Sequence, residues 1–108
     1  MTARMIRAVL ACVLACGMGA AQADAQAGRA KAKMCAVCHG EFGISILPNA
    51  PNLAGQPETY LAEQLKAYRS GKRSGEIMSV VAKPLTNSDI TDLAAWYASI
   101  AIEAKPLK

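Results

Sequence analysis

The sequence has few large side chains with which to build a protein core. Its 108 residues include one Trp, three Tyr and one Phe, so aromatic residues make up only 5% of the chain. A domain of this size is marginally stable on side-chain burial alone. Such small domains usually complete their cores with disulfides, a metal or a bound cofactor. The low aromatic content therefore indicates that something besides side chains fills the centre of the fold.

The chain also lacks a strong excess of charge of one sign. Its formal net charge is +4, and setting aside Arg4 and Arg7 near the start leaves ten basic and eight acidic side chains. This balance is too mild to indicate nucleic-acid binding, which requires many phosphate contacts from Lys and Arg. No acid–base pair and no nucleophile beside a base is recognisable, so we predict that the chain is not an enzyme.

The first 23 residues have the three zones of a secretory signal peptide. Residues 1–7 are basic, residues 8–21 are apolar and small, and Ala21-Gln22-Ala23 fits the small-x-small rule for signal peptidase. We therefore expect cleavage before Asp24 and export to the periplasm of a Gram-negative bacterium. Residues 24–108 would then form the domain, with no membrane span.

Two membrane-bound alternatives remain for this leader. A transmembrane anchor needs about 20 apolar residues, whereas this run is shorter and ends in small residues. Val13-Leu14-Ala15-Cys16 also resembles a bacterial lipobox, which would leave a lipid anchor on Cys16 and tether the domain to a membrane. The apolar stretch before Cys16 is short for that role, so release in soluble form is the preferred prediction.

Two helices are predicted in the first part of the domain. Residues 25–34 are rich in Ala, Lys and Arg, which are good helix formers. Residues 57–70 have apolar side chains at spacings of three and four, and Gly71 follows as a stop signal.

The third predicted helix is the clearest, over residues 86–100. Thr86 and Asp89 resemble a capping box at its start, and an apolar stripe follows. No segment alternates over enough residues to be a strand. The predicted fold class is therefore all-α, with long loops over residues 40–56 and 71–85 that must wrap around something.

The cysteines and the histidine that follow the leader lie together. Cys35-Ala36-Val37-Cys38-His39 has the Cys-x-x-Cys-His pattern of covalent haem attachment. Two thiols three residues apart can each bond a vinyl group of the same porphyrin, and the next residue then directs its imidazole at the iron. The pattern predicts one haem c per chain, with His39 as an axial ligand.

Three other chemistries fit this motif less well. A structural zinc site needs four Cys or His ligands, and the sequence after the leader offers three. A thioredoxin-like redox pair needs a strand–helix setting, which the helical pattern lacks. A disulfide between Cys35 and Cys38 is chemically allowed in an oxidising compartment, but it would close too short a loop to stabilise much.

Met78 is the candidate for the second axial ligand. After the leader, methionine occurs only at Met34 and Met78, and Met34 directly precedes Cys35, where it is badly placed to reach the opposite face of the ring. Met78 lies in the second predicted loop, far enough along the chain to fold over the haem. The alternative is that Met78 only fills the core. Ligation by His39 and Met78 would raise the reduction potential and suit electron transfer.

The motifs continue beyond the cysteines in a recognisable order. They are Cys35-Ala36-Val37-Cys38-His39-Gly40, Pro51-Asn52-Leu53-Ala54-Gly55-Gln56, Tyr60-Leu61, Gln64-Leu65, Arg69-Ser70-Gly71-Lys72-Arg73, Met78 and residues 85–97. With these motifs the chain resembles the class I c-type cytochromes of bacteria. It is most similar to the small periplasmic branch with one haem, whose domain also forms each half of the di-haem cytochromes.

The resemblance implies the cytochrome c fold, with three main helices and two long loops wrapped around one covalently bound haem. It implies that the cysteines of the motif form thioethers and that His39 and Met78 are the axial ligands. The Pro51 carbonyl would accept a hydrogen bond from the far ring nitrogen of His39, and Leu53 would pack on the haem. Gly28 would let the first and last helices cross closely.

The preferred function is transfer of single electrons between a donor and an acceptor protein of a respiratory or oxidative pathway. The alternative is a dedicated cytochrome c subunit of a dehydrogenase or oxidase complex. A haem enzyme or gas sensor would need an open iron site, which Met78 argues against. Lys66, Arg69, Lys72 and Arg73 form either a solvated face or a docking surface for an acidic partner.

Overall fold

The computed structural model describes residues 22–108, and all the regular structure in this part of the chain is helical. The helices are α1 (Ala25–Lys31), α2 (Lys33–His39), α3 (Glu58–Ser70), α4 (Met78–Ala82) and α5 (Asn87–Ser99). The all-α prediction is confirmed. The lipobox ending at Cys16 and nearly all of the leader lie outside the described residues. None of the helices described is long and apolar enough to cross a membrane.

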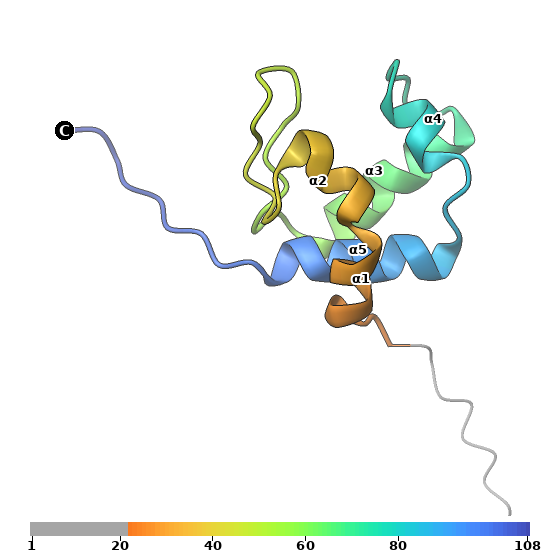
Figure 1. Ribbon diagram of the computed structural model, residues 1–108, viewed down its shortest axis with the longest axis horizontal. Helices are drawn as coiled ribbons and strands as arrows, with labels where there is room; N and C mark the ends of the chain where they lie inside the picture. The colour runs from red at the N-terminus through yellow and green to blue at the C-terminus, as the bar shows by residue number, and fades with distance from the viewer. Residues whose placement is uncertain (1–21) are drawn as a thin grey trace, which may run out of the picture.

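The crossing of α1 over α5 organises the fold (Figure 1). Gly28 lies at the contact, and a Cβ atom added there would stand 1.9 Å from the Asp92 carbonyl oxygen and 2.8 Å from Cβ of Trp96. Those distances are far inside van der Waals contact, so only a glycine lets the two backbones come this close. The predicted close crossing at Gly28 is confirmed.

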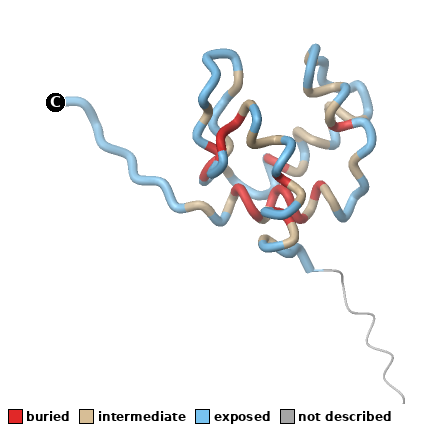
Figure 2. The backbone as a smooth tube through the Cα atoms, viewed as in Figure 1, coloured by how far each residue is buried: buried red, intermediate tan, exposed pale blue. Residues whose placement is uncertain are grey.

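The core is small and is concentrated on α5 (Figure 2). The capping box predicted for this helix is present, since the Thr86 hydroxyl accepts from the Asp89 N–H and the Asp89 carboxylate accepts from the Thr86 N–H. Buried residues from two other parts of the chain, the turn at Ala32 and helix α3, pack against it. The buried cluster consists of Ala32, Leu61, Leu93, Ala94, Trp96 and Tyr97.

The first predicted helix differs from the structure at its end. α1 stops at Lys31, Ala32 turns the chain, and α2 begins at Lys33, so the cysteine motif is itself helical. The N–H of Ala32 is shared between the carbonyls of Gly28 and Arg29, which is common where helices tighten at their ends. Ala and Lys carry no stop signal, so composition alone did not reveal the break.

The second loop contains a helix that the sequence pattern did not reveal. α3 ends at Gly71, whose φ of 82° confirms the predicted stop, but α4 then forms within residues 71–85. α4 has only five residues, which is too short for a recognisable period. Arg69 secures this region to the start of α5, because its guanidinium donates to the Leu85 carbonyl at 3.0 Å and to the Asn87 side chain at 2.7 Å.

Candidate haem site

α2 places both cysteines of the motif on one helical face. Residues three apart on a helix are neighbours, so Cys35 and Cys38 can address the same bound group. Both side chains are half-buried and both are free thiols. The disulfide alternative therefore does not describe this structure.

His39 ends α2 and is held by a hydrogen bond from its ring. The side chain is buried, and Nδ1 lies 2.7 Å from the carbonyl oxygen of Pro51. Because a carbonyl oxygen can only accept, Nδ1 must carry the ring proton. The lone pair is then on Nε2, which is the tautomer that a metal-bound histidine needs. The contact with Pro51 matches the expectation, and the role of His39 as an iron ligand stays a prediction.

Glycines shape the loop that brings Pro51 to His39. Gly40 has a φ of 80°, and a Cβ there would lie 1.9 Å from the Ile44 carbonyl oxygen. Further along, the Gly43 carbonyl accepts from the N–H groups of Leu53 at 2.7 Å and Ala54 at 3.0 Å. These bonds close the loop on itself, so the position of the Pro51 carbonyl is set by backbone geometry.

Ser45 and Asn52 brace the same loop, and sequence reasoning missed them. The Ser45 N–H donates to the Asn52 side-chain oxygen at 2.7 Å, and the Ser45 hydroxyl lies 3.2 Å from the Cys38 carbonyl oxygen. Ser and Asn beside Gly and Pro often make such side-chain to backbone bonds. The pattern gives no hint, however, that partners seven residues apart will meet.

The Cys35 thiol lies in an apolar setting beside Tyr97. Burial raises the pKa of Cys35, and the neighbouring Tyr97 hydroxyl partly opposes that change. The pKa of Tyr97 is also raised, chiefly by burial and then by the sulfur beside it. The Tyr97 hydroxyl makes no hydrogen bond of normal geometry within the described residues. Both groups therefore stay protonated at neutral pH.

Met78 is the first residue of α4, rather than a loop residue as expected, and it is half-buried. α2 and α4 lie apart, on the same side of α5 (Figure 1). Met78 therefore comes from a different element from His39, as a ligand on the opposite face of a ring would. Met34, on α2 itself, is exposed. Ligation by Met78 stays a prediction.

Both long loops carry apolar side chains. Leu53 is half-buried and packs on the core cluster, and its predicted contact with the haem stays a prediction. The exposed members of the set are Ile44, Ile46, Leu47, Ile77 and Val80. Exposed apolar side chains on a small domain favour contact with a large apolar ligand or partner. With the free thiols and the available imidazole lone pair, the residues present fit a haem c group.

Comparison with known proteins gives the family. Residues 25–101, well over half of the chain, match the cytochrome c family. The chain belongs to the cytochrome c family. Members of this family bind haem c covalently and transfer electrons, which confirms the cofactor and the general function predicted from the cysteine motif.

Curated relatives agree with this assignment. The chain is 45% identical over 83 residues to a cytochrome c4 of Pseudomonas aeruginosa, covering 77% of this chain and 41% of that protein. It is 46% identical over 79 residues to cytochrome c-554(548) of Halomonas halodenitrificans, covering 70% of this chain and 95% of that protein. It is 40% identical to a thiosulfate dehydrogenase electron acceptor of Thiomonas intermedia, covering 81% of this chain and 41% of that protein.

Solved structures show the same fold. The reduced recombinant cytochrome c4 of Pseudomonas stutzeri matches with a TM-score of 0.69 and 38% identity, covering 73% of this chain and 46% of the other. The cytochrome c fold prediction is thereby confirmed. This chain spans less than half the length of the cytochrome c4 relatives, but nearly all of cytochrome c-554(548).

The basic cluster of α3 and the following turn has two kinds of member. Arg69 is bound to Leu85 and Asn87, and the Arg73 guanidinium donates to Gln64 while lying 4.7 Å from the centre of the Tyr68 ring. Lys66 and Lys72 are exposed, and neither makes an ion pair within the described residues. The arginines therefore have structural contacts, whereas the two lysines are available to a partner.

Proposed function

We propose that this chain is an exported, periplasmic one-electron carrier whose haem is attached to Cys35 and Cys38 and ligated by His39 and Met78. The observation that carries the proposal is the His39 to Pro51 hydrogen bond, because it fixes the ligand tautomer next to two free thiols. When bound, the haem iron gains or loses one electron. The described residues contain no group of three or more His, Cys, Asp or Glu side chains that could hold a metal ion.

The protein's own part in this function is to keep the site rigid. The Pro51 carbonyl holds the proton of His39 at Nδ1 and fixes the plane of its ring. The Gly43 carbonyl and the Ser45–Asn52 pair hold the loop that carries Pro51. A site that moves little between charge states needs little reorganisation, and this favours fast transfer of one electron.

The proposed function as an electron carrier has a direct test. The exported protein should keep its haem through extraction with acidified organic solvent, and it should exchange single electrons with small redox reagents. Intact mass should show one haem per chain. Extractable haem would reject the attachment at Cys35 and Cys38, and sustained turnover of peroxide by the Met78-containing protein would reject the carrier function.

A second candidate is a dedicated electron acceptor for one enzyme. Two relatives carry the name thiosulfate dehydrogenase electron acceptor, with 40% and 31% identity to this chain. If an oxidoreductase is encoded beside this chain, coexpression of the two should give a stable complex under this candidate function. A protein that elutes alone, and that accepts electrons from several donors at similar rates, would favour the free carrier.

Lys66 and Lys72 are the residues with which to test docking of an acidic partner. Changing both to Glu should slow electron transfer with that partner, since charge complementarity mainly tunes the encounter rate. The rate should also fall as salt rises, because exposed charges are screened over about 8 Å at physiological ionic strength. If the electron-transfer rate changes neither with salt nor with these substitutions, the basic cluster is only a solvated face and not a docking surface.

A further inference from the structure

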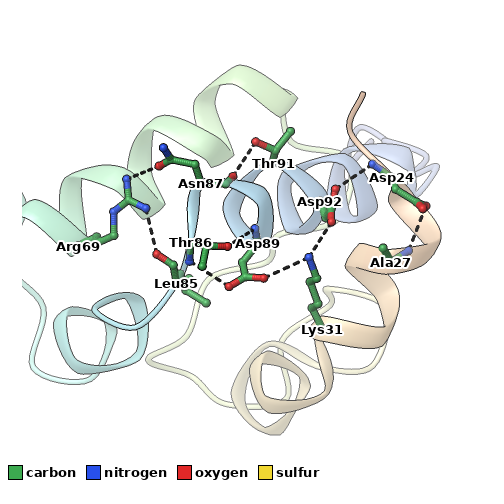
Figure 3. A network of polar contacts seen from close by, with 10 residues as sticks. All are labelled: Asp24, Ala27, Lys31, Arg69, Leu85, Thr86, Asn87, Asp89, Thr91 and Asp92. Carbon is green, nitrogen blue, oxygen red and sulfur yellow. Dashed lines mark hydrogen bonds and ion pairs between the residues drawn. The ribbon is translucent and has the colours of Figure 1, made fainter. Parts of the chain in front are cut away.

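The residue at the predicted processing site makes an unusual contact with α5. The main-chain nitrogen of Asp24 donates to Oδ1 of Asp92 at 3.0 Å, across 68 positions of sequence (Figure 3). Asp92 is buried, with 8% of its surface exposed, and its side chain faces Lys31 as well. Burying a carboxylate costs free energy unless it is paired, so the groups around Asp92 must offset that cost.

The charges around Asp92 are unbalanced when Asp24 is an ordinary amide. Lys31 Nζ lies 2.7 Å from Oδ2 of Asp92 and 3.1 Å from Oδ1 of Asp89, so one cation serves two carboxylates. The pKa of Asp92 lies below its ordinary value because of Lys31 and then the Asp24 N–H. Asp92 is therefore ionised at neutral pH, and within residues 22–108 the two carboxylates of Asp89 and Asp92 have ion pairs with one shared cation, Lys31.

We propose that signal-peptidase cleavage between Ala23 and Asp24 supplies a second cation, because the new N-terminal ammonium of Asp24 forms an ion pair with Asp92. Hydrolysis consumes one water, breaks the Ala23–Asp24 amide and leaves a carboxylate on Ala23 and an ammonium on Asp24. The nitrogen already lies at 3.0 Å from Oδ1, so the pair forms without movement of the chain. The proposal rests on the exported carrier proposed above, whose leader it requires to be cut at this bond.

One effect opposes the pair and another supports it. A positive charge at the start of α1 is unfavourable with the helix dipole. Asp24 offsets this with its own side chain, which caps α1 by accepting from the N–H groups of Gln26 and Ala27. A charge-assisted hydrogen bond from the ammonium to a buried carboxylate is also stronger than the hydrogen bond from the neutral backbone N–H that it replaces. We therefore expect the ion pair with Asp92 to outweigh the unfavourable interaction with the helix dipole.

The test compares two mature forms of the haem-loaded protein. One carries its own leader, and intact mass should show a start at Asp24. The other has a heterologous cleavable leader fused before Gln22, so that two exposed residues precede Asp24 and no ammonium can form there. In each form Asp92→Asn is compared with Asp89→Asn, which loses a Lys31 partner but does not touch Asp24.

We expect Asp92→Asn to shift the unfolding equilibrium about tenfold more in the Asp24-start form than in the Gln22-start form, which corresponds to about 1.4 kcal/mol. Asp89→Asn should shift both forms equally. The pair raises the pKa of the α-amino group above its unfolded value of about 8. The extra stability should therefore be complete below pH 8 and be lost as the pH rises through the higher folded value.

Three other charged groups face this pair: Lys31, Asp89 and the Asp24 carboxylate. All three are present in both forms. The difference in stability between the forms therefore reports the contribution of the ammonium alone. A mature start at any other residue, including an acylated Cys16, would overturn the proposal. So would equal effects of Asp92→Asn in the two forms. The haem content and reduction of the same samples report on the carrier function separately.

Discussion

At the crossing of α1 with α5 the polypeptide supplies its own core, whereas the loops of residues 40–56 and 71–85 turn apolar side chains outward. Ile90 in α5 is 0% exposed, while Ile46 in the first loop and Val80 in α4, within the second, are each 71% exposed. The Lys31 ion pairs join α1 to α5, and the Thr86 capping box stabilises the start of α5. The crossing is thus stabilised by its own side chains, and we expect the covalent haem c of the family to stabilise the two loops.

The largest expected effect follows from removing both thiols. Cys35→Ala with Cys38→Ala should abolish covalent haem, because no other cysteine follows the leader. Without haem the two long loops would have no group to pack against, and the protein should be mostly unfolded. Absorption spectra and circular dichroism check both parts. Native-like helical signal in the double variant would mean that the crossing alone sustains the fold.

Met78→Ala is expected to change the site and to leave the helix crossing intact. The weak red sulfur-to-iron band of the oxidised form should disappear, the reduction potential should fall and carbon monoxide should bind. Met34→Ala is the matched control, since Met34 is exposed on α2. If the band and the potential survive Met78→Ala, then Met78 only packs in the core.

Gly28→Ala should damage the crossing and spare the haem ligands. A Cβ at Gly28 would overlap backbone atoms of Asp92, so we expect a loss of about 3 kcal/mol in the free energy of unfolding. Gly71→Ala is the control, because Gly71 has nothing within 4 Å and only its positive φ opposes a side chain. That change should cost about 1 kcal/mol. Denaturant titration of both variants checks the ranking, which equal losses would contradict.

The smallest expected effect concerns acid stability at the crossing. The pKa of Asp89 is lowered by the Thr86 N–H first and by Lys31 next. A lowered folded pKa gives stability that is present above the unfolded value of about 3.9 and is lost as the pH falls through the folded one. Asp89→Asn should therefore flatten the acid limb of stability against pH. An unchanged acid limb in denaturant titrations would show that Asp89 contributes nothing there.

Several features could be predicted from local sequence because the interactions behind them span only a few residues. Thr86 and Asp89 satisfy the first N–H groups of α5 within three positions, and Gly71 ends α3 through its own backbone. The thiol spacing of Cys35 and Cys38 is likewise fixed by one helical turn. Helix α4 could not be predicted in this way, because five residues are too few to show a period. The break at Ala32 could not be predicted either, because the surrounding Ala and Lys residues all favour a helix.

The sequence by itself determined the chemistry of this protein, because the cysteine motif and its histidine are contiguous and need no folding to be recognised. Only the tertiary structure decided how that chemistry is held. The Pro51 carbonyl reaches His39 across 12 positions, and Asp24 reaches Asp92 across 68. Such contacts depend on the path of two loops and on the angle at which α1 crosses α5. No local propensity encodes either, since both follow from burying the same small core.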